Sequence, residues 1–140
     1  IKQADAVVIG TPVYFDTITS MIWAFIERFF GYRHVDIPIA GKPFVLVVGG
    51  AMMLDSAVAQ LHKVLGAFEV DVLDTVRFQS KVPPCFKCGR HRECEIGGAY
   101  KMFGDAAKEL KITKQMFTRW EDDSEVAAAV DAAAGKLKNI

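Results

Sequence analysis

Residues 4–30 decide the fold, and they read ADAVVIGTPVYFDTITSMIWAFIERFF. Residues 6–9 form a continuous apolar run, which is typical of a parallel strand covered on both faces. We predict that Gly10 and Pro12 end this strand, because glycine permits unusual dihedral angles and proline has no N–H for a neighbouring strand. The chain is therefore expected to leave the sheet at this point.

The residues that follow predict a helix and then a second round of the same pattern. Apolar residues recur at steps of three and four over residues 18–30, and Asp16 or Thr17 is the expected N-cap. A second apolar run at residues 44–48 again ends in glycine, and a second helix is expected to start at Asp55 or Ser56. Residues 70–78 predict a third strand.

Strands and helices that alternate in this way predict an α/β fold with a doubly wound parallel sheet, because the crossovers place helices on both faces. We expect residues 1–80 to form this sheet domain. Residues 81–140 are expected to pack on the same domain as a cysteine-containing loop, a short helix over residues 99–110 and a final helix capped near Asp123 and Ser124.

The composition of the chain limits its class and its partners. Its 140 residues are 51% hydrophobic and 24% charged, which fits a globular protein with a core. The 17 basic and 17 acidic residues balance, so no global field attracts nucleic acid. No apolar run approaches the roughly 20 residues of a membrane span. We therefore expect a cytoplasmic protein without nucleic-acid or membrane partners.

Ligands of open parallel sheets bind where the strands end at their carboxyl edge. Both segments that begin with glycine, after Ile9 and after Val48, are expected at that edge. Residues 11–15 can offer backbone N–H groups, one hydroxyl and two aromatic rings to a flat ligand. The alternative is that Tyr14 and Phe15 simply cover the end of the core.

The run ADAVVIGTPVYFDTITSMIWAFIERF, followed by GKPFVLVVGG, resembles the flavodoxin-like NAD(P)H-dependent FMN reductases and the related iron-sulfur flavoproteins. The resemblance covers roughly residues 4 to 80 and implies bound FMN, with NAD(P)H as the electron donor. It also implies the flavin contacts, which are Thr11, Pro12, Val13, Tyr14, Phe15, Gly49, Gly50 and Ala51. On this basis we expect Gly50→Val to block flavin binding and leave the fold intact. No acid–base catalyst is expected, because the cofactor carries the hard step.

Members of this family begin with a strand, a phosphate-binding loop, a helix and a second strand, which this sequence does not show. We expect a fragment of a longer polypeptide, since a sheet without these strands would expose apolar edges. The other interpretation is that a second chain supplies them.

Three cysteines lie within ten positions, in PPCFKCGRHREC. The spacing of Cys85 and Cys88 lets two thiolates converge on one metal, and Cys94 can reach the same centre. His91 could complete a zinc site, whereas an iron-sulfur cluster would require another cysteine. A thiol–disulfide switch and unligated thiols remain as alternatives.

Two functions from different classes follow from these patterns. The first is an FMN-dependent oxidoreductase that passes electrons from NAD(P)H to a small or protein acceptor. The alternative is a non-enzymatic flavodoxin-like electron carrier or a metal-stabilised interaction module. We also expect a homo-oligomer, because the aromatic helix 18–30, together with Met116, Phe117 and Trp120, carries more apolar surface than one small domain needs.

Overall fold

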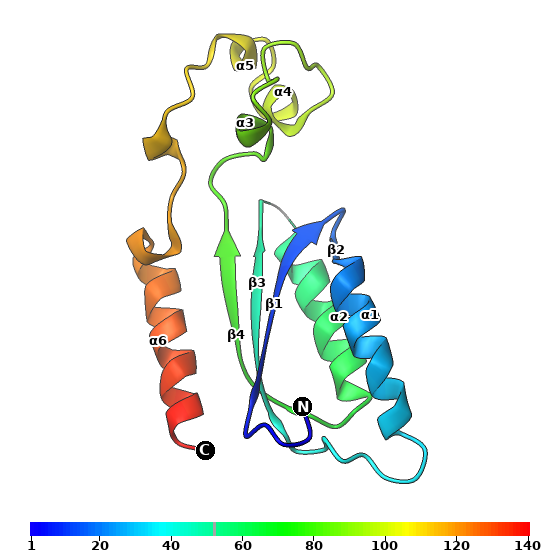
Figure 1. Cartoon of the computed structure of the whole chain (residues 1–140). Coiled ribbons are helices and arrows are strands. Elements are labelled where there is room, and N and C mark those ends of the chain that lie inside the picture. The colour runs from blue at the N-terminus through cyan, green and yellow to red at the C-terminus, as the bar shows by residue number, and fades with distance from the viewer. Residues whose placement is uncertain (52) are drawn as a thin grey trace. The chain divides into compact units, whose positions relative to one another are not determined.

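The computed structural model describes residues 1–51 and 53–140 and divides them into two compact units (Figure 1). Ile1–Gln79 and Trp120–Ile140 form the first, which we call the sheet unit. Ser80–Arg119 form the second, which we call the cysteine unit. The chain thus leaves the sheet unit after its last strand and returns to it for the C-terminal helix.

The sheet unit contains a four-stranded sheet in the order β2-β1-β3-β4. Its strands are β1 (Val7–Tyr14), β2 (Thr17–Ile18), β3 (Pro43–Gly50) and β4 (Asp71–Gln79). The pairs β1–β3 and β3–β4 are parallel, and the short β2 returns antiparallel to the end of β1. The prediction of an α/β fold with a largely parallel sheet is confirmed.

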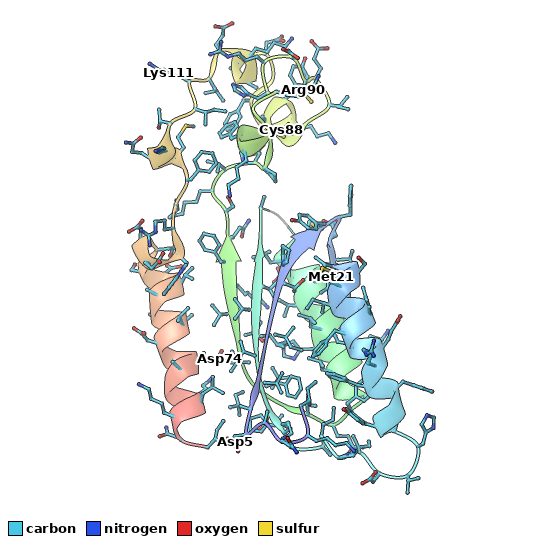
Figure 2. The ribbon with its side chains drawn as sticks, in the orientation of Figure 1. Asp5, Met21, Asp74, Cys88, Arg90 and Lys111 are labelled. Carbon is cyan, nitrogen blue, oxygen red and sulfur yellow. The ribbon has the colours of Figure 1, made fainter. Side chains whose placement is uncertain are left out.

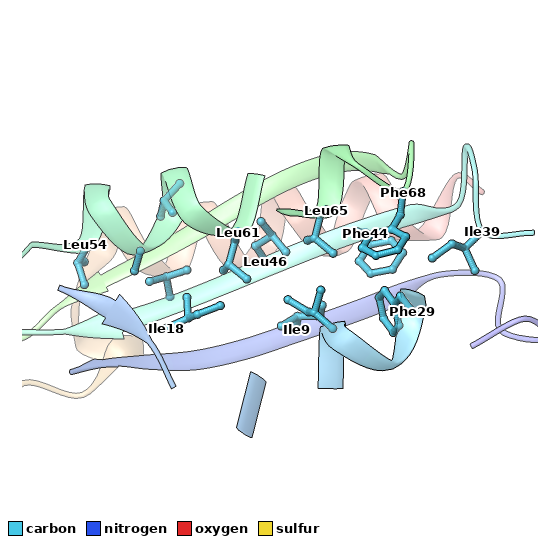
Figure 3. Packing of buried hydrophobic residues seen from close by; sticks show 14 residues of the cluster. Ile9, Ile18, Phe29, Ile39, Phe44, Leu46, Leu54, Leu61, Leu65 and Phe68 are labelled. Atoms are coloured by element: carbon cyan, nitrogen blue, oxygen red, sulfur yellow. The ribbon is translucent and has the colours of Figure 1, made fainter. Parts of the chain in front are cut away.

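Helices cover both faces of this sheet. On one face lie α1 (Ser20–Glu27), its 3-10 extension η1 (Arg28–Tyr32) and α2 (Leu54–Gly66), which enclose the main core (Figure 3). The largest fully buried side chains all belong to this core: Phe29, Phe44, Ile18, Ile26, Ile39, Leu46, Leu61, Leu65 and Val48. On the other face α6 (Ser124–Lys138) packs Val126 and Ala133 against Val45 and Val76. The burial of apolar side chains on each face stabilises the fold by roughly 25 cal/mol per Å² of apolar surface removed from water.

The C-terminal helix is fixed to the sheet by polar contacts as well. Asp123 caps α6 by accepting a hydrogen bond from the Val126 N–H at 3.4 Å, as the sequence predicted. Lys136 Nζ lies 2.9 Å from Asp74 Oδ2 and donates to the Leu73 carbonyl (Figure 2). The C-terminal end of α6 is therefore bound to β4. The hydrogen bond from Lys136 holds the pKa of Asp74 below its ordinary value.

The strands are longer than the sequence predicted. β1 does not end at Gly10 but continues through Pro12 to Tyr14, and β3 includes Gly49 and Gly50. Proline is tolerated on a strand that has no neighbour along much of one side, and β1 pairs with β2 only at Val13 and Tyr14 within the described residues. The prediction that Gly10 and Pro12 end the first strand is therefore wrong.

The starts of the helices also differ from the prediction. Thr17 and Ile18 form β2, and the buried Ile18 packs in the core from there, so the N-cap of α1 is Thr19. The N-cap of α2 is Met53, one residue before Leu54, instead of Asp55 or Ser56. Apolar spacing could not distinguish a residue of a short strand from the first turn of the next helix.

The cysteine unit has three short α-helices, α3 (Cys85–Cys88), α4 (Gly98–Phe103) and α5 (Ala106–Glu109), and the 3-10 turn η2 (Lys114–Met116). Phe86, Ala99 and Ala107 are the buried centre of its small core. The predicted helix over residues 99–110 is broken at Gly104, whose φ of 59° no α-helix accommodates. Outside this unit, the 3-10 turn η3 (Trp120–Asp122) precedes α6.

Candidate functional site

The two segments in which the sequence predicted ligand contacts lie side by side. Pro12 is the register partner of Gly49 in the parallel pair β1–β3, and Gly49 is in turn the partner of Phe78 on β4. The ends of three strands therefore form one continuous row at the carboxyl edge of the sheet. This is the place where open α/β sheets bind their ligands.

A strained hairpin turn lies at this edge. Phe15 and Asp16 join β1 to β2, and their φ angles are 51° and 62°. Positive φ at both central residues belongs to a type I′ turn, which normally carries Asn-Gly or a similar pair, and a bulky residue there is an outlier. Phe15 is nevertheless 100% exposed. Backbone strain of this kind is most often found at binding and active sites.

A second strained residue stands just beyond the neighbouring strand. Met53, the N-cap of α2, has a φ of 58° and an exposed side chain. Met21 in the first turn of α1 and Tyr14 at the end of β1 are exposed as well (Figure 2). The carboxyl edge thus presents apolar and aromatic side chains to solvent. Sequence reasoning missed Met21 and Met53, because no motif distinguishes an exposed methionine from one in the core.

Three other residues predicted to contact the flavin, Thr11, Val13 and Gly50, lie behind the carboxyl edge of the sheet. Thr11 is buried, and its hydroxyl donates to the Pro12 carbonyl at 2.9 Å and accepts from the Thr19 N–H at 3.4 Å. Val13 packs against the main core. A Cβ at Gly50 would come within 3.0 Å of Val13 Cβ and of Leu54 Cδ2. This close contact speaks against the expectation that Gly50→Val leaves the fold intact, because the added side chain would meet Val13 and Leu54.

Two glutamines hold the segments of the carboxyl edge in place. Gln60 of α2 accepts a hydrogen bond from the Thr17 hydroxyl at 2.6 Å and donates to the Asp16 carbonyl at 3.3 Å. Gln79, the last residue of β4, donates to the Ala51 carbonyl at 3.3 Å. Both were absent from the sequence prediction. A hint was available for Gln79, because it is a polar residue at the end of a predicted strand that reaches the same edge.

The cysteine unit places its potential ligands in three different environments. Cys85 and Cys94 are half-buried, and a Cβ at Gly97 would lie 3.0 Å from one sulfur and 3.1 Å from the other. Cys88 is exposed. His91 is buried against the Phe86 ring, and its Nε2 donates to the Leu110 carbonyl at 3.1 Å.

This arrangement does not fit the predicted metal site. Within residues 1–51 and 53–140, no group of three or more His, Cys, Asp or Glu side chains is arranged to hold a metal ion. The Nδ1 atom of His91 is buried without a hydrogen-bond partner, and Nε2 donates to the Leu110 carbonyl. The structure thus gives no support to zinc or an iron-sulfur cluster at Cys85, Cys88, Cys94 and His91.

The fold and the row of strand ends define a flavodoxin-like α/β protein. The chain belongs to the NADPH-dependent FMN reductase family, whose model matches residues 1–83. This match covers the sheet from β1 to β4 together with α1 and α2. The search among curated proteins gave no match. In the described part of the chain, no helix combines the length and the apolar character that crossing a membrane requires.

Proposed function

We propose that the sheet unit is the flavin-binding part of an FMN-dependent oxidoreductase, which passes electrons from NAD(P)H to a small or protein acceptor. The observation that carries the proposal is the exposed, strained Phe15 beside the adjacent ends of β1 and β3. A fully exposed aromatic ring in an unfavourable backbone conformation does nothing for the stability of the fold. Membership of the FMN reductase family supplies the ligand that such a ring would contact.

The residues at the carboxyl edge suit a flat aromatic ligand. Among the described residues, a Cβ at Gly49 would meet only the Phe78 carbonyl, at 3.8 Å, so the backbone there is open to close approach. We assign direct contacts with FMN to Pro12, Tyr14, Phe15, Gly49 and Ala51. When bound, FMN supplies two-electron chemistry between a nicotinamide and an acceptor.

The remaining predicted residues, Thr11, Val13 and Gly50, lie behind the surface that contacts FMN. We propose that Thr11, Val13 and Gly50 set the positions of the strand ends, through the Thr11 hydroxyl and the close contact of Gly50 with Val13. Backbone N–H groups of the two segments would stabilise negative charge on the bound ring. The chain's own part is therefore to bind and orient, without a side chain that transfers protons.

We also propose a homo-oligomer in which exposed residues of α1 and η1 meet a second copy. Ile26 and Phe29 are buried in the main core, whereas Met21, Phe25 and Phe30 remain exposed on the same helical segment. Apolar side chains exposed in series favour an interface. Light scattering at micromolar concentration tests this proposal, and a monomeric mass would contradict it.

The test of the main proposal is a fluorescence titration of FMN with the protein and with two matched variants. Tyr14→Ala removes a ring from the carboxyl edge, and we expect it to weaken FMN binding about tenfold, given the energy of aromatic pairs and the area they bury. Val35→Ala removes an exposed apolar side chain from the segment between η1 and β3, outside both the carboxyl edge and the proposed interface, and should leave the affinity unchanged. Equal affinities of the parent and Tyr14→Ala would contradict the assignment of this site.

Turnover separates the enzyme from the carrier. An oxidoreductase should oxidise NADH or NADPH steadily in the presence of FMN and a small electron acceptor such as ferricyanide or a quinone. A protein that binds FMN but shows no such turnover would be an electron carrier instead.

A further inference from the structure

The sulfurs of Cys85 and Cys94 converge on one point of the cysteine unit. That point is the empty side-chain position of Gly97, 3.0 Å from Cys85 Sγ and 3.1 Å from Cys94 Sγ. Any side chain at residue 97 would push the two sulfurs out of their present positions. The two thiols are therefore neighbours in space, although eight residues separate them in the sequence.

The unit that contains these thiols has little else to hold it together. Its buried centre consists of Phe86, Ala99 and Ala107, with partly buried side chains around them, and Cys85 is one of these. Segments of about 40 residues rarely bury enough apolar surface to fold firmly without a cross-link or a metal. The neighbouring sulfurs of Cys85 and Cys94 offer one such cross-link, a covalent bond between them.

The chain between the two cysteines already turns back on itself. Gly89, at the C-terminal end of α3, has a φ of 75°, and its N–H donates to the Cys85 carbonyl at 3.2 Å. Beyond Cys94, the Glu95 carboxylate lies 2.6 Å from Lys108 Nζ, which fixes this segment to α5. Both approaches to the pair are thus ordered by contacts that do not involve sulfur.

We propose that Cys85 and Cys94 form a reversible redox pair, which closes an intramolecular disulfide by exchange with a low-molecular-weight disulfide. One cysteine thiolate attacks a sulfur of the disulfide RSSR, forms a mixed disulfide and releases one RS⁻. The second cysteine thiolate then attacks the protein sulfur of the mixed disulfide, which forms the Cys85–Cys94 bond and releases the second RS⁻. The protein gives up two electrons and two protons, and RSSR is reduced to two thiols. Cys88 takes no part in the bond.

The direct test uses the whole chain in buffers of reduced and oxidised glutathione that span a range of potentials. Free thiols are trapped with an alkylating reagent, and mass spectrometry of proteolytic peptides identifies the linked residues. We expect one Cys85–Cys94 bond per chain. Cys88 should stay free, and therefore be alkylated, until the buffer is oxidising enough to attach glutathione to it directly. Cys88→Ser should keep the same midpoint potential, whereas Cys85→Ser and Cys94→Ser should each abolish the bond.

A matched pair of glycine variants tests the geometry itself. Gly97→Ala places a methyl group between the sulfurs; two free thiols can rotate away from it separately, but two bonded sulfurs cannot. We expect the equilibrium constant for oxidation to fall at least about tenfold, which raises the midpoint potential by about 30 mV for a two-electron couple. Gly98→Ala is the control, because its Cβ would lie at an ordinary contact distance of 3.8 Å from Cys85 Sγ.

Three results would overturn the proposal. The first is a bond that involves Cys88 in place of the predicted pair, or three thiols that stay free at the most oxidising potential. The second is a near-stoichiometric amount of zinc or iron in protein purified without air, with thiols that react only after chelation. The third is an identical midpoint potential for Gly97→Ala and Gly98→Ala.

Discussion

Gly50 and Val13 approach so closely that a Cβ on the glycine would lie 3.0 Å from Val13 Cβ. We predict that Gly50→Ala lowers the free energy of unfolding by about 1–3 kcal/mol, because the methyl group overpacks the contact between β1, β3 and α2. The neighbouring Gly49→Ala should change it by less than about 0.5 kcal/mol, since only the Phe78 carbonyl, at 3.8 Å, is near. Urea unfolding of both variants measures the difference. Equal losses of unfolding free energy at the two positions would show that the close contact with Val13 is not the cause of the loss at Gly50.

The strained turn allows stability and binding to be separated. Phe15→Asn should raise the free energy of unfolding by about 0.5–1 kcal/mol, because asparagine accepts a positive φ more readily than phenylalanine does. The same change should weaken FMN binding, because the exposed ring is lost. Asp16→Gly relieves the adjacent φ of 62° and should add stability with FMN affinity unchanged. If Phe15→Asn binds FMN as tightly as the parent, the strain at this residue does not serve the ligand.

The contact between Thr17 and Gln60 should carry a measurable coupling energy. Thr17→Val, Gln60→Ala and the double variant complete a thermodynamic cycle around the 2.6 Å hydrogen bond. We expect a coupling of about 0.5–1.5 kcal/mol in the free energy of unfolding, the ordinary net contribution of such a bond. Additive effects of the two substitutions would mean that the hydrogen bond between Thr17 and Gln60 does not stabilise the turn.

The ion pair between α6 and β4 should make stability depend on pH. The bond from Lys136 lowers the pKa of Asp74 in the folded state, so its contribution is present above the unfolded pKa and is lost as pH falls through the folded pKa. We predict that Asp74→Asn costs up to about 1 kcal/mol at pH 7, because the pair is partly exposed. The difference from the parent should shrink below about pH 4.

The control for this experiment is Asp71→Asn, on the same strand and exposed. Unfolding in urea from pH 7 to pH 3 gives both curves. A difference between the parent and Asp74→Asn that stays constant over this range would contradict the role of the ion pair.

The order of strands and helices could be predicted because long apolar runs and helical spacing indicate these elements without knowledge of the tertiary contacts. The run at residues 44–48 lies within β3, the strand predicted over residues 70–78 corresponds to β4 (Asp71–Gln79), and Asp123 caps the last helix. The turn at Phe15 could not be predicted, since phenylalanine disfavours positive φ and only the completed hairpin holds it there. The sequence predicted that Cys85, Cys88 and Cys94 converge, but not that Gly97 lies between Cys85 and Cys94 while Cys88 is exposed, because this depends on how α3 and the segment before α4 pack.

The late position of α6 in the sequence has a consequence for how the protein emerges from the ribosome. When β4 has been synthesised, the face of the sheet that contains Val45 and Val76 still lacks its cover, because Val126 and Ala133 follow only after residues 80–119. Synthesis proceeds at about 5–20 residues per second, so this apolar face stays open for several seconds. A nascent chain that stalls in the cysteine unit would present this face to chaperones, or to a second nascent chain on the same message.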